Sequence, residues 1–211
     1  MATPRIFHPP LRKGLYLVTP DEPDTDRLST RVRAVLDQAV LLQYRNKVAD
    51  SALKRRQLTM LARLCREFDV PLIVNDDPEL AIDTDADGVH LGEHDGDVRN
   101  ARMRLGGNAI IGVSCYDDSS RARAGADAGA SYLAFGAFFT SPTKPAARRA
   151  SIALLRETAL FGLPRVAIGG ITPENATVLI EAGAELIAVI SGVFDAPDPV
   201  AAASAYRRCF D

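Results

Sequence analysis

The sequence has few cysteines, and none of them form a pair at the spacing of metal ligands. Cys65, Cys115 and Cys209 are odd in number and make no C-x-x-C motif. This argues against a disulfide framework and against a structural zinc site, and it predicts reduced thiols. His90 has no second histidine or cysteine at zinc spacing either, so we interpret it as a core or loop residue and not as a metal ligand.

An excess of charge of either sign is also lacking. The 211 residues include 25 basic and 27 acidic side chains, for a net charge of −2. Because the chain has no general positive field, we expect it to bind neither nucleic acid nor an anionic membrane. Any anion site must therefore be local.

Long apolar segments are missing as well. No run reaches the roughly 18 to 20 apolar residues that a membrane span needs. The stretch MATPRIFHPPLRKG at the N-terminus has no apolar core of the kind found in a secretory signal. We expect a cytoplasmic protein with a single domain over residues 1–211, beginning with a short irregular extension at about 1–13.

Short β-rich runs alternate with segments of helical period. The expected strands are 14–19, 40–44, 71–75, 87–91, 109–114, 131–136, 165–170 and 186–191. Most are apolar along their whole length, which is typical of a parallel sheet covered on both faces. Eight strand–helix units in about 200 residues predict an α/β fold, a single (β/α)8 TIM barrel, with a doubly wound open sheet as the alternative.

Helical segments lie between these runs. Leu58, Leu61, Ala62 and Cys65 recur at helical spacing, and TPENATVLIEAGA opens with a threonine cap followed by proline. APDPVAAASAYRRCF is expected to form the last helix. The two prolines and small polar residues of FFTSPTKPAARRAS predict a long loop, within residues 139–150.

Polar residues follow the strands at the ends where barrel enzymes carry their chemistry. Gln43, Arg45 and Lys47 alternate at the end of one apolar run, so on an extended chain they would share a face. Arg45, Lys47 and Lys144 can bind phosphate oxygens. Solvated strand-end cations are an equally good interpretation of Arg45 and Lys47 taken alone.

Two aspartates and a glycine pair complete the pattern. Asp76 and Asp95 are hard oxygen ligands, and two carboxylates beside phosphate oxygens suit magnesium (Mg²⁺). Gly169 and Gly170 allow backbone N–H groups to approach an anion at the start of a helix. Asp77 is better interpreted as a helix cap.

Ser114 also ends a strand. It has no nucleophile-elbow motif and no obvious histidine partner, so we do not expect a serine hydrolase.

These segments, in this order, resemble the thiamine phosphate synthase family of (β/α)8 enzymes over nearly the whole chain. The likeness is carried by QYRNK, NDD, DGVHLG with a following Asp, GVS, SPTK, AIGGI and AVIS. It implies a transferase that joins 4-amino-2-methyl-5-hydroxymethylpyrimidine diphosphate to a thiazole phosphate, giving thiamine phosphate and diphosphate in thiamine biosynthesis.

The resemblance also implies roles for residues. Gln43 would recognise the pyrimidine. Arg45 and Lys47 would hold its diphosphate together with Asn75, Lys144 and Mg²⁺ on Asp76 and Asp95. Catalysis would rest on Arg45, Lys144 and Ser114, with Ser114 orienting the pyrimidine or the departing group. The thiazole phosphate would contact Ser141, Thr143, Gly170, Ile190 and Ser191.

Departures from the family pattern are few. Tyr116 stands where the family often has histidine, and Ser141 replaces the first threonine of the T-x-T-K loop. Two alternatives remain: a thiazole tautomerase of the same barrel family, and a non-catalytic barrel that senses phosphorylated ligands. The expected partners are the two small-molecule substrates, and the sequence leaves the oligomeric state open, a homo-oligomer included.

Overall fold

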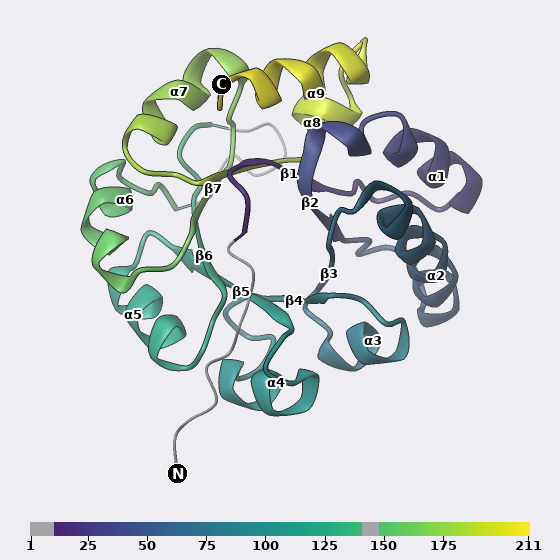
Figure 1. Ribbon diagram of the computed structural model, residues 1–211, viewed down its shortest axis with the longest axis horizontal. Helices are drawn as coiled ribbons and strands as arrows, with labels where there is room; N and C mark the ends of the chain where they lie inside the picture. The colour runs from purple at the N-terminus through teal and green to yellow at the C-terminus, as the bar shows by residue number, and fades with distance from the viewer. Residues whose placement is uncertain (1–10, 141–147) are drawn as a thin grey trace.

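The computed structural model describes residues 11–140 and 148–211. Within these ranges eight parallel strands follow one another around a closed barrel, and the last pairs with the first (Figure 1). The strands are β1 (Gly14–Val18), β2 (Ala39–Tyr44), β3 (Leu72–Asn75), β4 (Gly88–Leu91), β5 (Ile110–Tyr116), β6 (Tyr132–Phe135), β7 (Arg165–Ile168) and β8 (Leu186–Val189). The barrel prediction is confirmed, and the open-sheet alternative is wrong.

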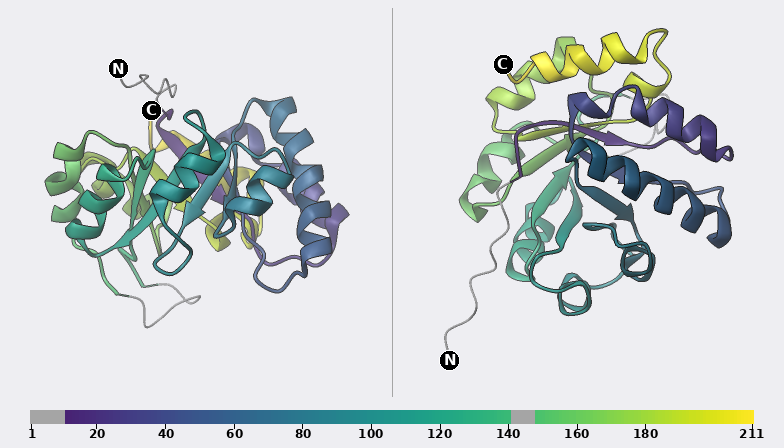
Figure 2. Two further views of the ribbon diagram at one scale, coloured as in Figure 1. Left: turned by 90° about the horizontal axis from the view of Figure 1, so that it is seen from below. Right: turned by 45° about the vertical axis from the view of Figure 1, so that its right-hand side comes forward.

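Helices cover the outside of the barrel on all sides (Figure 2). They are α1 (Thr25–Arg33), η1 (Leu36–Gln38), α2 (Ser51–Phe68), α3 (Pro78–Asp83), α4 (Val98–Leu105), α5 (Ser119–Asp127), α6 (Ala153–Glu157), η2 (Thr158–Phe161), α7 (Pro173–Glu181), α8 (Ser191–Phe194) and α9 (Pro199–Arg208). Among the described helices, none combines the length and the apolar character that crossing a membrane requires.

The helix starts follow from the sequence. Asp77 caps α3 by accepting a hydrogen bond from the backbone N–H of Leu80 at 2.9 Å, as predicted. Thr172 caps α7, with Pro173 in its first turn and Asn175 completing a capping box. Both starts place the N-terminus of a helix directly after a strand, at the end of the barrel where the polar residues gather.

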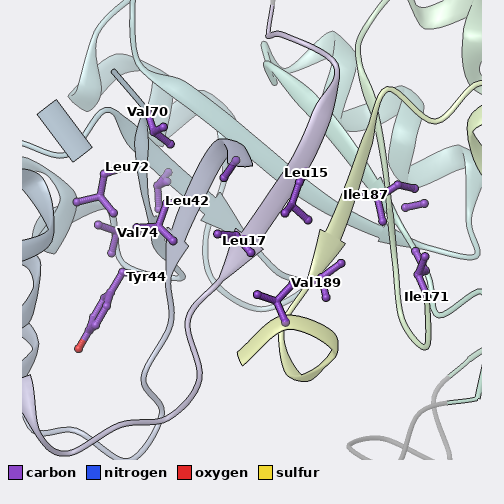
Figure 3. Close-up of a cluster of buried hydrophobic side chains, with 14 of the residues drawn as sticks. Leu15, Leu17, Leu42, Tyr44, Val70, Leu72, Val74, Ile171, Ile187 and Val189 are labelled. Atoms are coloured by element: carbon purple, nitrogen blue, oxygen red, sulfur yellow. The ribbon is translucent and has the colours of Figure 1, made fainter. Parts of the chain in front are cut away.

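Two apolar layers hold the fold together. The outer layer lies between strands and helices and includes Leu17, Leu42, Leu72 and Ile187, all less than 2% exposed (Figure 3). The inner layer fills the barrel itself with Tyr16, Val18, Leu41, Ile73, Tyr132, Ala134, Val166, Leu186 and Ala188. The strands are therefore buried on both faces, which explains why their sequences are apolar throughout.

Arg102, on α4, ties the strand starts of β5 and β6 together. Its guanidinium donates to the carbonyl oxygens of Ala109 at 2.6 Å and Gly129 at 2.9 Å, and to Ser131 Oγ at 3.1 Å. Partial burial lowers the pKa of this guanidinium. Arg102 thus donates several hydrogen bonds to backbone carbonyls and to Ser131, and it forms no ion pair with a residue of 11–140 or 148–211.

We expect Arg102→Leu to lower the free energy of unfolding by about 1–2 kcal/mol, because it leaves part-buried carbonyl oxygens without a donor. Arg104→Leu, two residues along the same helix, removes only an exposed ion pair with Glu79 and should cost about 0.5 kcal/mol or less. Urea unfolding of both variants measures the difference. Equal losses would contradict this role for Arg102.

Candidate functional site

The loop after β1 holds the loop after β2. Thr19 Oγ1 donates to the carbonyl oxygen of Arg45 and accepts from its N–H, both at 2.9 Å. Asp21 Oδ1 accepts from the backbone N–H of Lys47 at 2.7 Å and lies 3.5 Å from the Arg45 guanidinium. We call these contacts the β1–β2 clamp. The clamp fixes the backbone positions from which the Arg45 and Lys47 side chains extend.

The predicted alternation applies only in part. The strand ends at Tyr44, so Gln43 points into the barrel while Arg45 and Lys47 lie beyond the strand. Arg45 is half-buried, and the Lys47 side chain is 56% exposed. The clamp, and not strand geometry, therefore brings the two cations to the site.

The two predicted metal ligands lie together. Asp76 follows β3 with a left-handed backbone, φ 68°, and its N–H donates to the carbonyl oxygen of His90 at 2.8 Å. Burial, and then a side-chain hydrogen bond with Asp95 and its charge, raise the pKa of Asp76. Lys47 Nζ lies 3.9 Å from Asp76 Oδ2 and acts in the opposite direction. Because Lys47 supplies one positive charge beside two carboxylates, a bound metal ion could balance the remaining negative charge.

The donor set fits a hard divalent cation. In the described ranges no group of three His, Cys, Asp or Glu side chains comes together, so the protein offers two carboxylates and no complete shell. Mg²⁺ usually takes one or two carboxylates and completes its shell with water and substrate phosphate oxygens. Asp76 and Asp95 match that requirement.

A cavity of about 410 Å³ adjoins the cations and is lined by Arg45, Lys47, Asn75 and Asp76. Lys54 also lines it, from the first turn of α2, and sequence reasoning missed this residue. A cation is unfavourable at the positive end of a helix unless it meets an anion. A lysine in the first turn of a predicted helix is therefore the signal in the sequence that could have revealed Lys54.

Ser114 does have a histidine partner, so the expectation of none was wrong. His90 Nε2 lies 2.9 Å from Ser114 Oγ, and His90 Nδ1 lies 2.9 Å from the Tyr132 hydroxyl. Burial lowers the pKa of His90 to about 4, so the imidazole is neutral near pH 7. Since its second nitrogen meets a tyrosine and not a carboxylate, the pair is no hydrolase triad.

Tyr116 ends β5 with a left-handed backbone, φ 55°. The guanidinium groups of Arg121 and Arg148 lie 5.6 and 5.3 Å from its ring centre. Glu93 pairs with both arginines, at 3.4 and 3.2 Å. A residue that departs from the family pattern is thus packed into a charged cluster beside the loop that carries Asp95.

The glycine pair forms a tight turn between β7 and α7. Gly170 has φ 65°, and a Cβ there would lie 2.7 Å from the carbonyl carbon of Phe139. The same turn is held by a hydrogen bond from the N–H of Phe139 to the carbonyl oxygen of Gly169 at 2.9 Å. Glycine is required here by close packing of two loops.

The other predicted residues fall into two groups. Ile190 caps α8 and Ser191 begins it, next to the end of β8, with Ser191 exposed. Ser141, Thr143 and Lys144 lie outside the described residues. Of the predicted loop, residues 139–140 and 148–150 contain neither helix nor strand.

A closed (β/α)8 barrel with cations, paired carboxylates and a glycine turn at the C-terminal ends of its strands defines a class: barrels that bind phosphorylated small molecules at that rim. The family model of thiamine monophosphate synthase matches residues 15–193. The chain belongs to this family.

Relatives and solved structures agree with that assignment. The chain is 58% identical to the thiamine-phosphate synthase of Xanthomonas campestris pv. campestris (strain 8004), over 94% of this chain and 96% of that protein. Identity to the thiamine-phosphate synthase of Xylella fastidiosa (strain 9a5c) is 53%, with 97% and 90% covered. Thiamine phosphate pyrophosphorylase from Pyrococcus furiosus superposes with a TM-score of 0.83 at 32% identity, over 94% and 96% of the chains.

Proposed function

We propose that the protein is a thiamine-phosphate synthase. It joins the aminopyrimidine diphosphate to a thiazole phosphate and releases diphosphate. The observation that carries the proposal is the meeting of Arg45, Lys47, Asp76 and Asp95 at one end of the barrel. Gln43 lies two residues before Arg45 and points into the barrel. A leaving diphosphate needs that combination of cations and metal ligands.

The reaction follows from charge stabilisation. The bond between the pyrimidine methylene carbon and the diphosphate oxygen breaks, and the diphosphate leaves with the electron pair. The aminopyrimidine stabilises the methylene cation, and the thiazole nitrogen then forms the new bond to carbon. Arg45, Lys47 and Lys144 neutralise the departing charge, while Asn75 donates to it.

Magnesium is part of the proposal. Asp76 and Asp95 would hold Mg²⁺, which when bound offsets negative charge on the diphosphate. Ser141, Thr143, Gly170, Ile190 and Ser191 would bind the thiazole phosphate, largely through backbone N–H groups and hydroxyls. We place the reaction in the cytoplasm, in a single-domain enzyme that acts on small molecules.

A turnover assay tests the proposal. The purified protein is mixed with both phosphorylated precursors and Mg²⁺, and chromatography follows thiamine phosphate and diphosphate together. Equal amounts of the two products are expected. Isomerisation of the thiazole without release of diphosphate would favour a tautomerase, and binding without turnover would favour a sensor.

Ser114→Ala should lower kcat by roughly 10- to 100-fold with little change in KM, because its hydroxyl bond strengthens as the diphosphate leaves. Steady-state kinetics with each substrate varied in turn measures both constants. A raised KM with unchanged kcat would mean that Ser114 only binds substrate.

A further inference from the structure

Five side chains form one hydrogen-bonded chain across the inside of the barrel. Gln43 Nε2 donates to the Tyr16 hydroxyl at 2.6 Å, and the Tyr16 and Tyr132 hydroxyls lie 2.7 Å apart. Tyr132 continues to His90 Nδ1, and His90 Nε2 continues to Ser114 Oγ, both at 2.9 Å. We call this series the barrel relay. It joins β2 to β5 through β1, β6 and β4.

The relay is shielded from water except at its last member, Ser114, which is half-buried. Tyr16 and Tyr132 are 1% and 0% exposed, and Gln43 and His90 are 5% and 8% exposed. The Tyr132 ring meets the Tyr16 ring edge-on at 5.8 Å and stacks on the His90 ring at 5.6 Å. This packing keeps water away from the buried hydroxyl groups. Each buried proton in the series must therefore be donated to an acceptor within the series.

Counting protons gives the series a direction. Tyr16 has one proton, accepts from Gln43 and has Tyr132 as its one other hydroxyl partner among the described residues, so its proton goes to Tyr132. Tyr132 accepts from Tyr16 and therefore donates to its remaining partner among the described residues, His90 Nδ1. Because Nδ1 accepts, the imidazole proton sits on Nε2 and is donated to Ser114 Oγ. The proton of Ser114 is then left for another acceptor.

We propose that the barrel relay positions Ser114: the amide orientation of Gln43 fixes the tautomer of His90 and so makes the Ser114 hydroxyl a hydrogen-bond donor to the substrate. Tyr16, Tyr132 and His90 are positioning residues that act through Ser114. A reversed amide at Gln43 would reverse every link and turn the Ser114 proton inward, toward His90.

The proposal rests on the proposed function for its link to substrate. With one N–H committed to Tyr16 and no further hydrogen bond from its amide to a described residue, Gln43 keeps an N–H and a carbonyl oxygen. An aminopyrimidine edge offers the matching amino donor and ring-nitrogen acceptor. A substrate bound in this way would hold the amide in the orientation that the relay needs.

The tautomer can be observed without substrate or turnover. In protein labelled with ¹⁵N at histidine, long-range ¹H–¹⁵N correlation spectra distinguish protonated from unprotonated ring nitrogens. We expect His90 to carry its proton on Nε2 alone. A proton on Nδ1 in the unsubstituted protein would overturn the proposal, whatever the protein catalyses.

Gln43→Glu tests transmission along the relay. An ionised carboxylate only accepts, so Tyr16 must donate to it and each following link reverses. At about pH 9, where even a buried glutamate ionises, the His90 proton should move from Nε2 to Nδ1. An unchanged Nε2 proton would overturn the relay.

The matched control is Tyr206→Phe. It removes a buried tyrosine hydroxyl outside the relay, bonded to the carbonyl oxygen of Ile171 at 2.8 Å. This variant should leave the His90 spectrum as it is.

A kinetic cycle tests whether Tyr132 acts through Ser114. Tyr132→Phe removes one internal hydrogen bond and should lower kcat by about five- to tenfold, with KM little changed. In the Ser114→Ala background the same substitution should change kcat by less than about twofold. Losses that multiply in the double variant would contradict a role exerted through Ser114.

Discussion

Asp76→Asn is expected to lower kcat/KM by about 100- to 1,000-fold, because it removes a negative charge from the proposed magnesium site. Asparagine is the suitable replacement, since Asp76 has φ 68° and asparagine tolerates the left-handed conformation better than other residues with a side chain. Asp95→Asn should have a similar effect. Turnover is measured as a function of Mg²⁺ concentration, and both variants should need more of it.

The neighbouring aspartate supplies the control. Asp77 lines the same cavity as Asp76, but its carboxylate is engaged as the cap of α3, and asparagine caps a helix about as well. Asp77→Asn should therefore keep both stability and turnover close to those of the unsubstituted protein. If Asp76→Asn or Asp95→Asn turned over normally at limiting Mg²⁺, the substituted residue would not be a metal ligand.

The second large effect is expected at Gly170. A methyl group in Gly170→Ala would press on the backbone of Phe139 and Thr140, so the turn that is proposed to hold the thiazole phosphate must shift. We expect at least about 30-fold weaker binding of the thiazole phosphate. Pyrimidine diphosphate with Mg²⁺ should bind as before. Lys47→Ala should do the reverse, weakening the diphosphate by about tenfold.

Gly162→Ala separates the local backbone cost from the loop contact. Gly162 has φ 68°, close to that of Gly170, but no atom lies within 4 Å of a Cβ built there. This variant should lose about 1 kcal/mol of stability and bind both ligands normally. Calorimetric titration of each ligand, with circular dichroism to check folding, gives the comparison. If Gly170→Ala and Lys47→Ala both fold but each loses both ligands, the two anion sites are not separate.

Local patterns were sufficient to predict most of the fold. Apolar runs with helical segments between them predicted eight strands and a closed barrel, because period and burial on both faces are properties of short stretches. The cap at Asp77 was predicted for the same reason. Strand ends also predicted that Lys47, Asp76 and Asp95 would gather at one rim, and they do, since parallel strands in a barrel all finish at one side.

Contacts between distant side chains could not be predicted in this way. His90 and Ser114 are 24 residues apart and meet because adjacent strands fix their register. Nothing within either strand signals the pair. The β1–β2 clamp was likewise hidden, because Thr19 and Asp21 precede the residues they hold by 26 positions.

The clamp has a consequence for protein engineering. Loops of a (β/α)8 barrel are often treated as separate modules that can be exchanged while the barrel stays the same. Here the backbone of Arg45 and Lys47 is held by Thr19 and Asp21, so the cation loop depends on the loop that precedes it. A graft of the cation loop into another barrel would therefore have to carry residues 19–21 with it, and the unit of exchange is a pair of loops.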